Sequence, residues 1–185
     1  KKLILYAPTW RDDRYYTYGR YKFEFFFDLH QVKNALESQA VLLCKPHYLV
    51  ADRPQPSDSF VHWFPPEQDI QELLLVSDVL ITDYSSVMFD FSILGRPMIF
   101  YMHDADHYRD EVRGFYFDLA TCAPGPVVTA TESLIHELRQ VLHDEPEYWR
   151  KHGSAYEAFR RRFNHAETGD AARKIVHWIE HGRLE

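Results

Sequence analysis

The sequence has no long apolar run, few cysteines and no excess of basic residues, and each of these absences excludes a class of protein. A membrane-spanning helix needs about 18 or more apolar residues, and neither such a run nor a signal peptide is present. The 2 cysteines, Cys44 and Cys122, favour a reduced, cytoplasmic setting over a disulfide framework. The 28 acidic residues outnumber the 21 basic ones, and this balance argues against broad binding of nucleic acid or anionic membranes.

The order of apolar runs along the 185 residues predicts the fold class. Short apolar runs indicate strands, and helical spacing or capping patterns, such as Asp28 before the first helix, indicate helices. Strands that alternate with helices predict an α/β fold, a Rossmann-like parallel sheet flanked by helices. The expected strands are 3–7, 41–44, 60–63, 79–81 and 98–100, and the expected helices are 28–38, 69–76, 85–94, 129–143, 144–163 and 168–182.

The domain organisation follows from the same pattern. Residues 1–163 are expected to form one Rossmann-like domain, and residues 164–185 a closing helix packed on it. Residues 9–27 and 51–59 are expected to be loops. Because strand-like residues begin at Lys1, we expect the chain to be a piece of a longer protein.

A phosphate site is predicted where the strand at 79–81 meets the next helix. Ser85 and Ser86 stand at the helix start, where free N–H groups and the positive end of the helix dipole attract anions. These two hydroxyls replace the glycines of the usual dinucleotide fingerprint. The alternative is that the serines only cap the helix. No Gly-x-Ser-x-Gly pattern surrounds them, which argues against a nucleophilic serine.

Other polar residues end neighbouring strands, and the carboxyl ends of parallel strands meet at one edge of the sheet. Thr9 and Arg11 follow the first strand, and Lys45 and His47 follow the second. The guanidinium of Arg11 suits phosphate, with an ion pair to the adjacent aspartates as the alternative. His47 is a candidate for acid chemistry or phosphate contact, against a structural role.

Three further features carry weaker signals. Asp90 lies one turn after Ser86 among apolar residues, so it needs a partner such as sugar hydroxyls or a group within the protein. His103 and His107 have a spacing that can share a metal, but without a third ligand a solvated helix face is the better interpretation. Arg113 can reach a phosphate, although its segment reads as a structural loop.

Several of these segments, taken together, resemble the CDP-glycerol glycerophosphotransferase family, the teichoic acid and capsule polymerases of bacteria. The resemblance covers residues 3–177 and rests on the segments 7–11, 45–47, 77–90, 95–97, 113–118 and 124–126. It implies that the chain is the C-terminal, donor-binding half of a GT-B transferase. One departure is Tyr48, where the family commonly has proline after the histidine.

The resemblance also implies a reaction and a set of roles. Glycerol phosphate, or another alditol phosphate, moves from a CDP-activated donor to a lipid-linked polyol-phosphate acceptor, with release of CMP and without a cofactor or metal. Ser85 and Ser86 would hold donor phosphate and Asp90 the ribose hydroxyls. Arg11 and His47 would face the pyrophosphate, and His47 would protonate or neutralise the leaving CMP. Thr9, Lys45 and Arg113 are additional phosphate candidates.

The missing N-terminal half would supply the general base and the acceptor site, so we expect this chain to bind the donor but turn over poorly. The full-length protein is expected to associate peripherally with the membrane. Two alternatives stay open at this point. One is a GT-B glycosyltransferase domain that uses a nucleotide sugar, and the other is a non-catalytic nucleotide-binding module.

Overall fold

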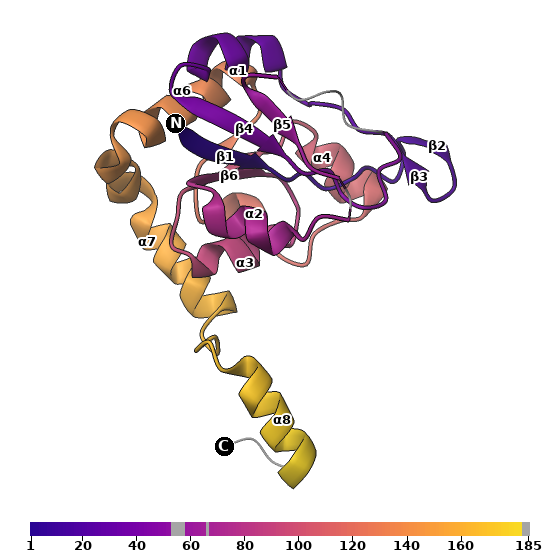
Figure 1. Cartoon of the computed structure of the whole chain (residues 1–185), viewed down its shortest axis with the longest axis vertical. Helices are drawn as coiled ribbons and strands as arrows, with labels where there is room; N and C mark the ends of the chain where they lie inside the picture. Colours follow the sequence, from indigo (N-terminus) through magenta and orange to yellow (C-terminus); the bar gives the residue numbers. More distant parts are fainter. Residues whose placement is uncertain (53–57, 66, 183–185) are drawn as a thin grey trace.

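The strands of the main sheet all run parallel in the computed structural model, which describes residues 1–52, 58–65 and 67–182. Their order is β5-β4-β1-β6-β7-β8, so β1 and β6 lie at the centre (Figure 1). This arrangement confirms the predicted Rossmann-like α/β class. The strands are β1 (Lys2–Tyr6), β4 (Ala40–Cys44), β5 (Val61–Trp63), β6 (Val79–Thr82), β7 (Met98–Tyr101) and β8 (Val127–Val128).

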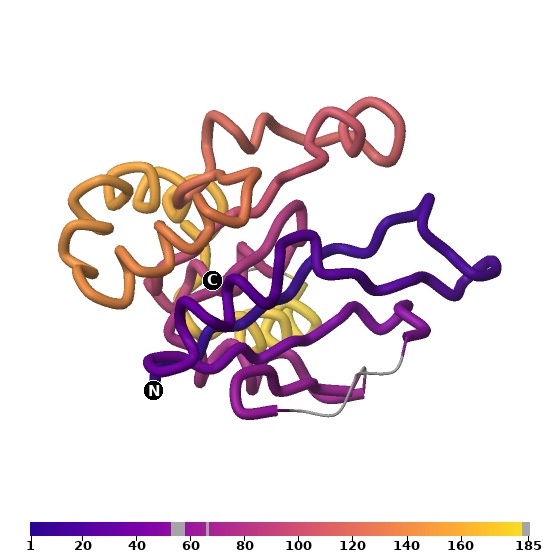
Figure 2. The backbone as a smooth tube through the Cα atoms, turned by 90° about the horizontal axis from the view of Figure 1, so that it is seen from above, coloured from indigo at the N-terminus to yellow at the C-terminus, as the bar shows by residue number. Residues whose placement is uncertain are grey.

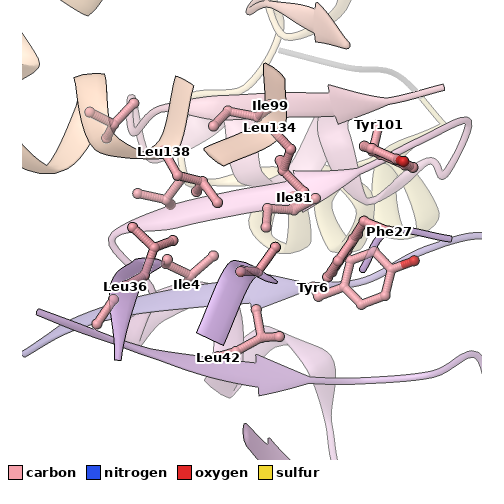
Figure 3. Close-up of a cluster of buried hydrophobic side chains, with 14 of the residues drawn as sticks. Ile4, Tyr6, Phe27, Leu36, Leu42, Ile81, Ile99, Tyr101, Leu134 and Leu138 are labelled. Carbon is pink, nitrogen blue, oxygen red and sulfur yellow. The ribbon is translucent and has the colours of Figure 1, made fainter. Parts of the chain in front are cut away.

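Helices cover both faces of the sheet because successive strand side chains point to opposite faces. Ile4 and Tyr6 pack with α1 (Leu29–Leu36) and α6 (Thr131–His143) on one face, as Figure 3 shows. Leu5 packs on the other face, with α2 (Ile70–Val76), α3 (Val87–Ile93) and α7 (Glu145–Phe163). The remaining helices are α4 (Ala105–His107), the π-helical η1 (Tyr108–Val112), α5 (Leu119–Cys122) and α8 (Ala171–His181).

The predicted helix starts are confirmed at two places and wrong at a third. The carboxylate of Asp28 accepts a hydrogen bond from the N–H of Gln31 at 3.0 Å, and Asp69 caps α2 in the same way. The helix expected from residue 129 is α6, which begins at Thr131 without a side-chain cap. The Thr131 hydroxyl instead accepts a hydrogen bond from the N–H of Asp28 at 3.0 Å and so joins α6 to the start of α1.

Two short elements were not expected from the sequence, one of them inside the loop predicted at 9–27. An antiparallel hairpin joins β2 (Tyr15–Thr17) to β3 (Arg20–Tyr21) within 9–27. Strand β8 extends the sheet beside β7. Both escaped prediction because strands of two or three residues are too short to show an apolar alternation. Of the loop predicted at 51–59, residues 53–57 lie outside the described residues.

The expected packing of the closing helix is not seen. No residue of α8 is buried, and Figure 1 shows α8 beyond the end of α7 and away from the sheet. Trp178 of α8 is 54% exposed, whereas Tyr156 and Phe159 of α7 are buried. The domain contacts end near Asn164, whose side-chain amide donates to the carbonyl of Phe89 in α3 at 3.2 Å. None of the helices in the described residues is long and apolar enough to cross a bilayer.

Candidate functional site

A cavity of about 790 Å³ opens at the carboxyl edge of the sheet, where the loops after β1, β4 and β6 meet the segment after β7. This volume is in the range of small-molecule sites. The wall combines polar groups from the strand ends with several aromatic rings. The lining residues are Thr9, Trp10, His47, Tyr84, Ser85, Ser86, Met88, Phe89, Tyr108, Arg113, Gly114, Phe115, Tyr116, Phe117 and Leu119.

The two serines sit on the cavity wall in the turn between β6 and α3. The hydroxyl of Ser86 makes no capping hydrogen bond, and that of Ser85 accepts only a long one, 3.4 Å from the N–H of Val87. The backbone N–H groups of both serines donate no hydrogen bond within the described part of the chain. Two residues of the cavity wall therefore keep hydroxyl and amide groups available to a ligand, which is compatible with the predicted phosphate site.

His47 lines the cavity as a neutral ring. Its imidazole stacks on Trp10 with 3.9 Å between ring centroids, and Nδ1 accepts a hydrogen bond from the N–H of Leu49 at 3.2 Å. The proton of the neutral ring is therefore on Nε2. Burial, with the charges of Arg113 and Lys45, lowers the pKa of His47 to about 4. At neutral pH the side chain thus offers a hydrogen-bond donor rather than a positive charge.

This lowered pKa makes the fold sensitive to acid. Between pH 6.5 and 4 the unfolded chain binds a proton at His47 that the folded chain does not, so His47 reduces the unfolding free energy as pH falls. Because the ring is only half-buried, we expect this loss to be about 1 to 2 kcal/mol. His47→Asn, whose amide oxygen can still accept from Leu49, should lose less stability on acidification than wild type in urea unfolding at both pH values. His30→Asn, at an exposed position of α1, is the matched control, and identical pH profiles for His47→Asn and wild type would contradict the assignment.

Arg11 is not among the described residues that line the cavity, and its predicted contact with phosphate stays a prediction. The side chain is 2% exposed and forms ion pairs with Asp83 and Asp104. Nη1 donates to Asp83 Oδ2 at 2.9 Å, and Nε donates to Asp104 Oδ2 at 2.7 Å. Burial alone would lower the pKa of Arg11, but the hydrogen bonds and charges of Asp104 and Asp83 outweigh it and raise the pKa.

The ion pairs of Arg11 connect three strand ends behind the cavity wall. Asp83 Oδ1 also accepts hydrogen bonds from the N–H of Thr9 at 2.9 Å and of Tyr84 at 2.6 Å. The Tyr84 hydroxyl donates to Asp104 Oδ1 at 3.0 Å. The buried network therefore fixes Thr9 and Tyr84, both of which line the cavity, and Arg11 acts as a positioning residue.

Two more predicted site residues, Lys45 and Asp90, are not among the described residues that line the cavity. Lys45 is 6% exposed, and burial lowers its pKa. Asp90 is exposed rather than enclosed by its apolar neighbours, although partial desolvation raises the pKa of its carboxyl. The contacts predicted for Lys45 with phosphate and for Asp90 with ribose stay predictions.

The segment after β7 contributes more to the site than its sequence indicated. Arg113 makes a bidentate ion pair with Asp12, and its Cζ lies 4.3 Å from the centroid of the Trp10 ring. Gly114, Phe115 and Phe117 follow it along the cavity wall. From its sequence this segment reads as a structural loop, and only Arg113 was a candidate for a ligand contact.

The two histidines weighed as metal ligands have protein partners. His107 Nε2 lies 2.8 Å from Asp13 Oδ2, and the ring of His103 stacks on Phe26 with 4.4 Å between centroids. The described residues contain no group of three or more side chains that could hold a metal ion.

The fold and the cavity together define a Rossmann-like α/β domain with a cavity at the carboxyl edge of its parallel sheet, where ligands bind in folds of this class. The chain belongs to the CDP-glycerol:poly(glycerophosphate) glycerophosphotransferase family, whose sequence model matches residues 1–181.

Relatives and solved structures agree with this assignment. The chain is 45% identical over 181 residues to the teichoic acid poly(glycerol phosphate) polymerase of Bacillus subtilis, covering 97% of this chain and 24% of the relative. It is 44% identical over 179 residues to the teichoic acid glycerol-phosphate transferase of Staphylococcus aureus, covering 97% of this chain and 45% of the relative. The wall teichoic acid polymerase TagF superposes with a TM-score of 0.81 at 38% identity, covering 97% of this chain and 43% of TagF. A TagF variant soaked with CDPG superposes equally well. The chain thus spans less than half the length of these relatives.

Proposed function

We propose that this chain is the donor-binding half of a two-domain GT-B transferase that moves glycerol phosphate from CDP-glycerol to a growing poly(glycerol phosphate) chain. The observation that carries the proposal is the cavity wall, where the hydroxyls and free N–H groups of Ser85 and Ser86 lie near His47 and Arg113. These donors match a diphosphate. The aromatic part of the wall offers apolar surface for the rest of the nucleotide.

The proposed reaction is a phosphoryl transfer. The acceptor hydroxyl oxygen attacks the phosphorus that carries glycerol, the bond from this phosphorus to the bridging oxygen breaks, and CMP leaves with that oxygen. The hydroxyl proton passes to a base, which we assign to the part of the protein outside this chain. Catalysis of such transfers depends on positioning and on stabilisation of negative charge.

Four polar residues of the cavity wall, and Asp90 beside it, then have specific roles in donor binding. The amides and hydroxyls of Ser85 and Ser86 hold the donor phosphates. The Nε2–H of His47 and the guanidinium of Arg113 donate to the oxygens of the leaving CMP. The negative charge of the bound diphosphate favours protonation of His47, which opposes its low pKa in the free chain. Asp90, exposed one turn beyond Ser86, is proposed to meet the ribose hydroxyls when the donor is bound.

The first test is donor binding by this chain, measured by calorimetry with CDP-glycerol. Ser86→Ala removes one hydroxyl that faces the cavity, and loss of a hydrogen bond to a charged phosphate is expected to weaken binding about tenfold. Ser154→Ala, at an exposed position of α7, is the matched control and should bind like wild type. Equal affinities for Ser86→Ala and wild type would remove the Ser86 hydroxyl from the phosphate site.

A donor panel separates the proposal from the glycosyltransferase alternative. We expect CDP-glycerol, or CDP-ribitol if another alditol is the natural one, to bind more tightly than UDP-sugars. Preferential binding of a UDP-sugar would favour the glycosyltransferase. Donor binding without transfer by the full-length protein would favour a non-catalytic module. A lipid-linked acceptor and peripheral membrane attachment of the full-length protein complete the proposal.

A further inference from the structure

The hairpin formed by Tyr15–Thr17 and Arg20–Tyr21 brings three exposed tyrosines together on one short element. It extends away from the sheet in both views of the chain, at the end towards which β1 points (Figures 1 and 2). Tyr15 is 54% exposed, Tyr16 57% and Tyr18, at the tip, 99%. Gly19 has a φ of 77°, and this left-handed conformation allows the tight turn that lifts Tyr18 into solvent. We call residues 15–21 the tyrosine hairpin.

The tyrosine hairpin is held in a fixed direction by hydrogen bonds at its base. The N–H of Tyr21 donates to the carbonyl of Leu49 at 3.2 Å, and the N–H of Ala51 donates to the carbonyl of Tyr21 at 2.8 Å. The carboxylate of Asp52 accepts from the Tyr16 hydroxyl at 2.8 Å and from the N–H of Phe23 at 2.5 Å. The exposed rings are therefore presented on a braced element.

The chemistry of the tyrosine hairpin suits a polyanion. Arg20 makes no ion pair within the described part of the chain, and Lys22 Nζ lies 5.0 Å from the centroid of the Tyr16 ring. Arg14 is different because it pairs with Glu24. The Tyr16 hydroxyl is engaged by Asp52, so the donors that remain are these two cations and the hydroxyls of Tyr15 and Tyr18, on a chain whose net charge is −7. Tyrosine, arginine and lysine donors are the groups that contact phosphate oxygens along a phosphodiester backbone.

The position of the tyrosine hairpin connects it to the candidate site. The ring of Tyr21 lies 6.2 Å from the ring of Trp10, which in turn stacks on His47. Trp10 and His47 line the cavity, so the tyrosine hairpin continues the cavity wall outwards. A long ligand that has its reacting end at the cavity can therefore lie along these tyrosines.

We propose that the tyrosine hairpin binds the alditol-phosphate chain of the acceptor behind its reacting hydroxyl. This inference rests on the proposed function, which supplies a polyanionic acceptor. The tip carries hydroxyls and a guanidinium rather than aliphatic groups, and these donors suit phosphate oxygens better than an apolar protein face. The contrast is with α8, whose exposed residues Ile175, Val176 and Ile179 are aliphatic.

The test uses this chain and a short synthetic glycerol phosphate oligomer, with binding measured by calorimetry. Tyr18→Ala and Arg20→Ala, both at exposed positions, are each expected to weaken oligomer binding about three- to tenfold. Binding by Arg20→Ala should also depend less steeply on salt, because one phosphate contact is lost. Arg161→Ala and Trp178→Ala, on α7 and α8, match the two changes in charge and aromaticity and should leave oligomer affinity unchanged.

Donor affinity distinguishes failure of this inference from failure of the proposed function. Both tyrosine hairpin variants should bind CDP-glycerol as wild type does. Unchanged oligomer affinity in the Tyr18→Ala, Arg20→Ala double variant would overturn the inference while donor binding stands. If the same double variant instead lowered the thermal stability of the full-length protein without changing oligomer binding, the tyrosine hairpin would be a contact between protein domains and the inference would be wrong. Absence of CDP-glycerol binding by wild type would count against the proposed function alone.

Discussion

Arg11→Met is expected to lower the unfolding free energy of the chain by about 3 to 5 kcal/mol, because it leaves two buried carboxylates without their cation. Asp83 is 3% exposed and Asp104 13%, so water cannot replace the guanidinium around either side chain. Arg11 also lies against Phe26, with Cζ 4.8 Å from the ring centroid, and methionine retains part of this apolar contact. Urea unfolding followed by tryptophan fluorescence measures the loss.

Two controls identify the cause of this destabilisation. Adding Asp83→Asn and Asp104→Asn to Arg11→Met removes the stranded charges and should recover part of the stability. Arg160→Ala breaks an exposed ion pair with Glu157, which is worth less than about 1 kcal/mol. A loss of similar size for Arg11→Met and Arg160→Ala would show that the network around Arg11 does not stabilise the fold.

Gly125→Ala is expected to lower the free energy of unfolding nearly as much as Arg11→Met, because the added methyl group clashes with its neighbours. A Cβ at this position would lie 2.0 Å from the carbonyl oxygen of Met98 and 2.7 Å from the hydroxyl of Tyr148. That hydroxyl donates to the Met98 carbonyl at 2.9 Å and accepts from the Met98 N–H at 3.1 Å, so neither group can move freely. Overpacking against backbone should therefore cost about 3 kcal/mol, measured by the same urea unfolding.

Gly153→Ala makes the same chemical change as Gly125→Ala but is expected to raise the free energy of unfolding. Gly153 lies inside α7, and its added Cβ would be 4.0 Å from the nearest atom, in the ring of Trp149. Alanine favours the helix over glycine by about 0.5 to 1 kcal/mol, so this variant should be more stable than wild type. Destabilisation of both glycine variants to the same extent would contradict the packing argument at Gly125.

The strands were predictable because each central strand is a short, continuous apolar run, as expected when both faces of a parallel sheet are covered. β1 and β6 show this, and their carboxyl ends place Thr9, Ser85 and Ser86 on one cavity as predicted. His47 reaches the same cavity from the end of β4. Arg113 reaches the cavity from the segment after β7. The sequence therefore predicted correctly that polar side chains gather at the carboxyl edge of the sheet.

The pairing of charges at this edge was not predictable. Asp12 and Asp13 are the nearest acids to Arg11 in sequence, but Asp12 pairs with Arg113 and Asp13 with His107. Arg11 instead pairs with Asp83 and Asp104, which lie 72 and 93 residues away. Only the arrangement of the strands brings these partners together, and sequence spacing carries no information about it.

Asp90 illustrates a second limit of sequence-based prediction, which concerns the direction of a side chain on a helix. Its neighbours Phe89 and Phe91 are apolar, which suggested an enclosed carboxylate, but successive helix positions point about 100° apart. Phe91 faces the core and Asp90 faces solvent. The aromatic cavity wall around Phe115 was not predicted for a related reason. An irregular segment has no periodicity from which the direction of its side chains can be predicted.

The separation of α8 from the domain affects how unfolding of this chain is to be interpreted. An isolated helix of 11 residues is marginal in water, and α8 buries no residue that would couple it to the sheet. Its helicity therefore melts gradually and independently, whereas the sheet and the helices packed on it lose structure in one cooperative transition. Far-ultraviolet circular dichroism sums the two processes. A single free energy of unfolding accordingly describes the part of the chain that ends near Asn164, where α7 is fastened to α3.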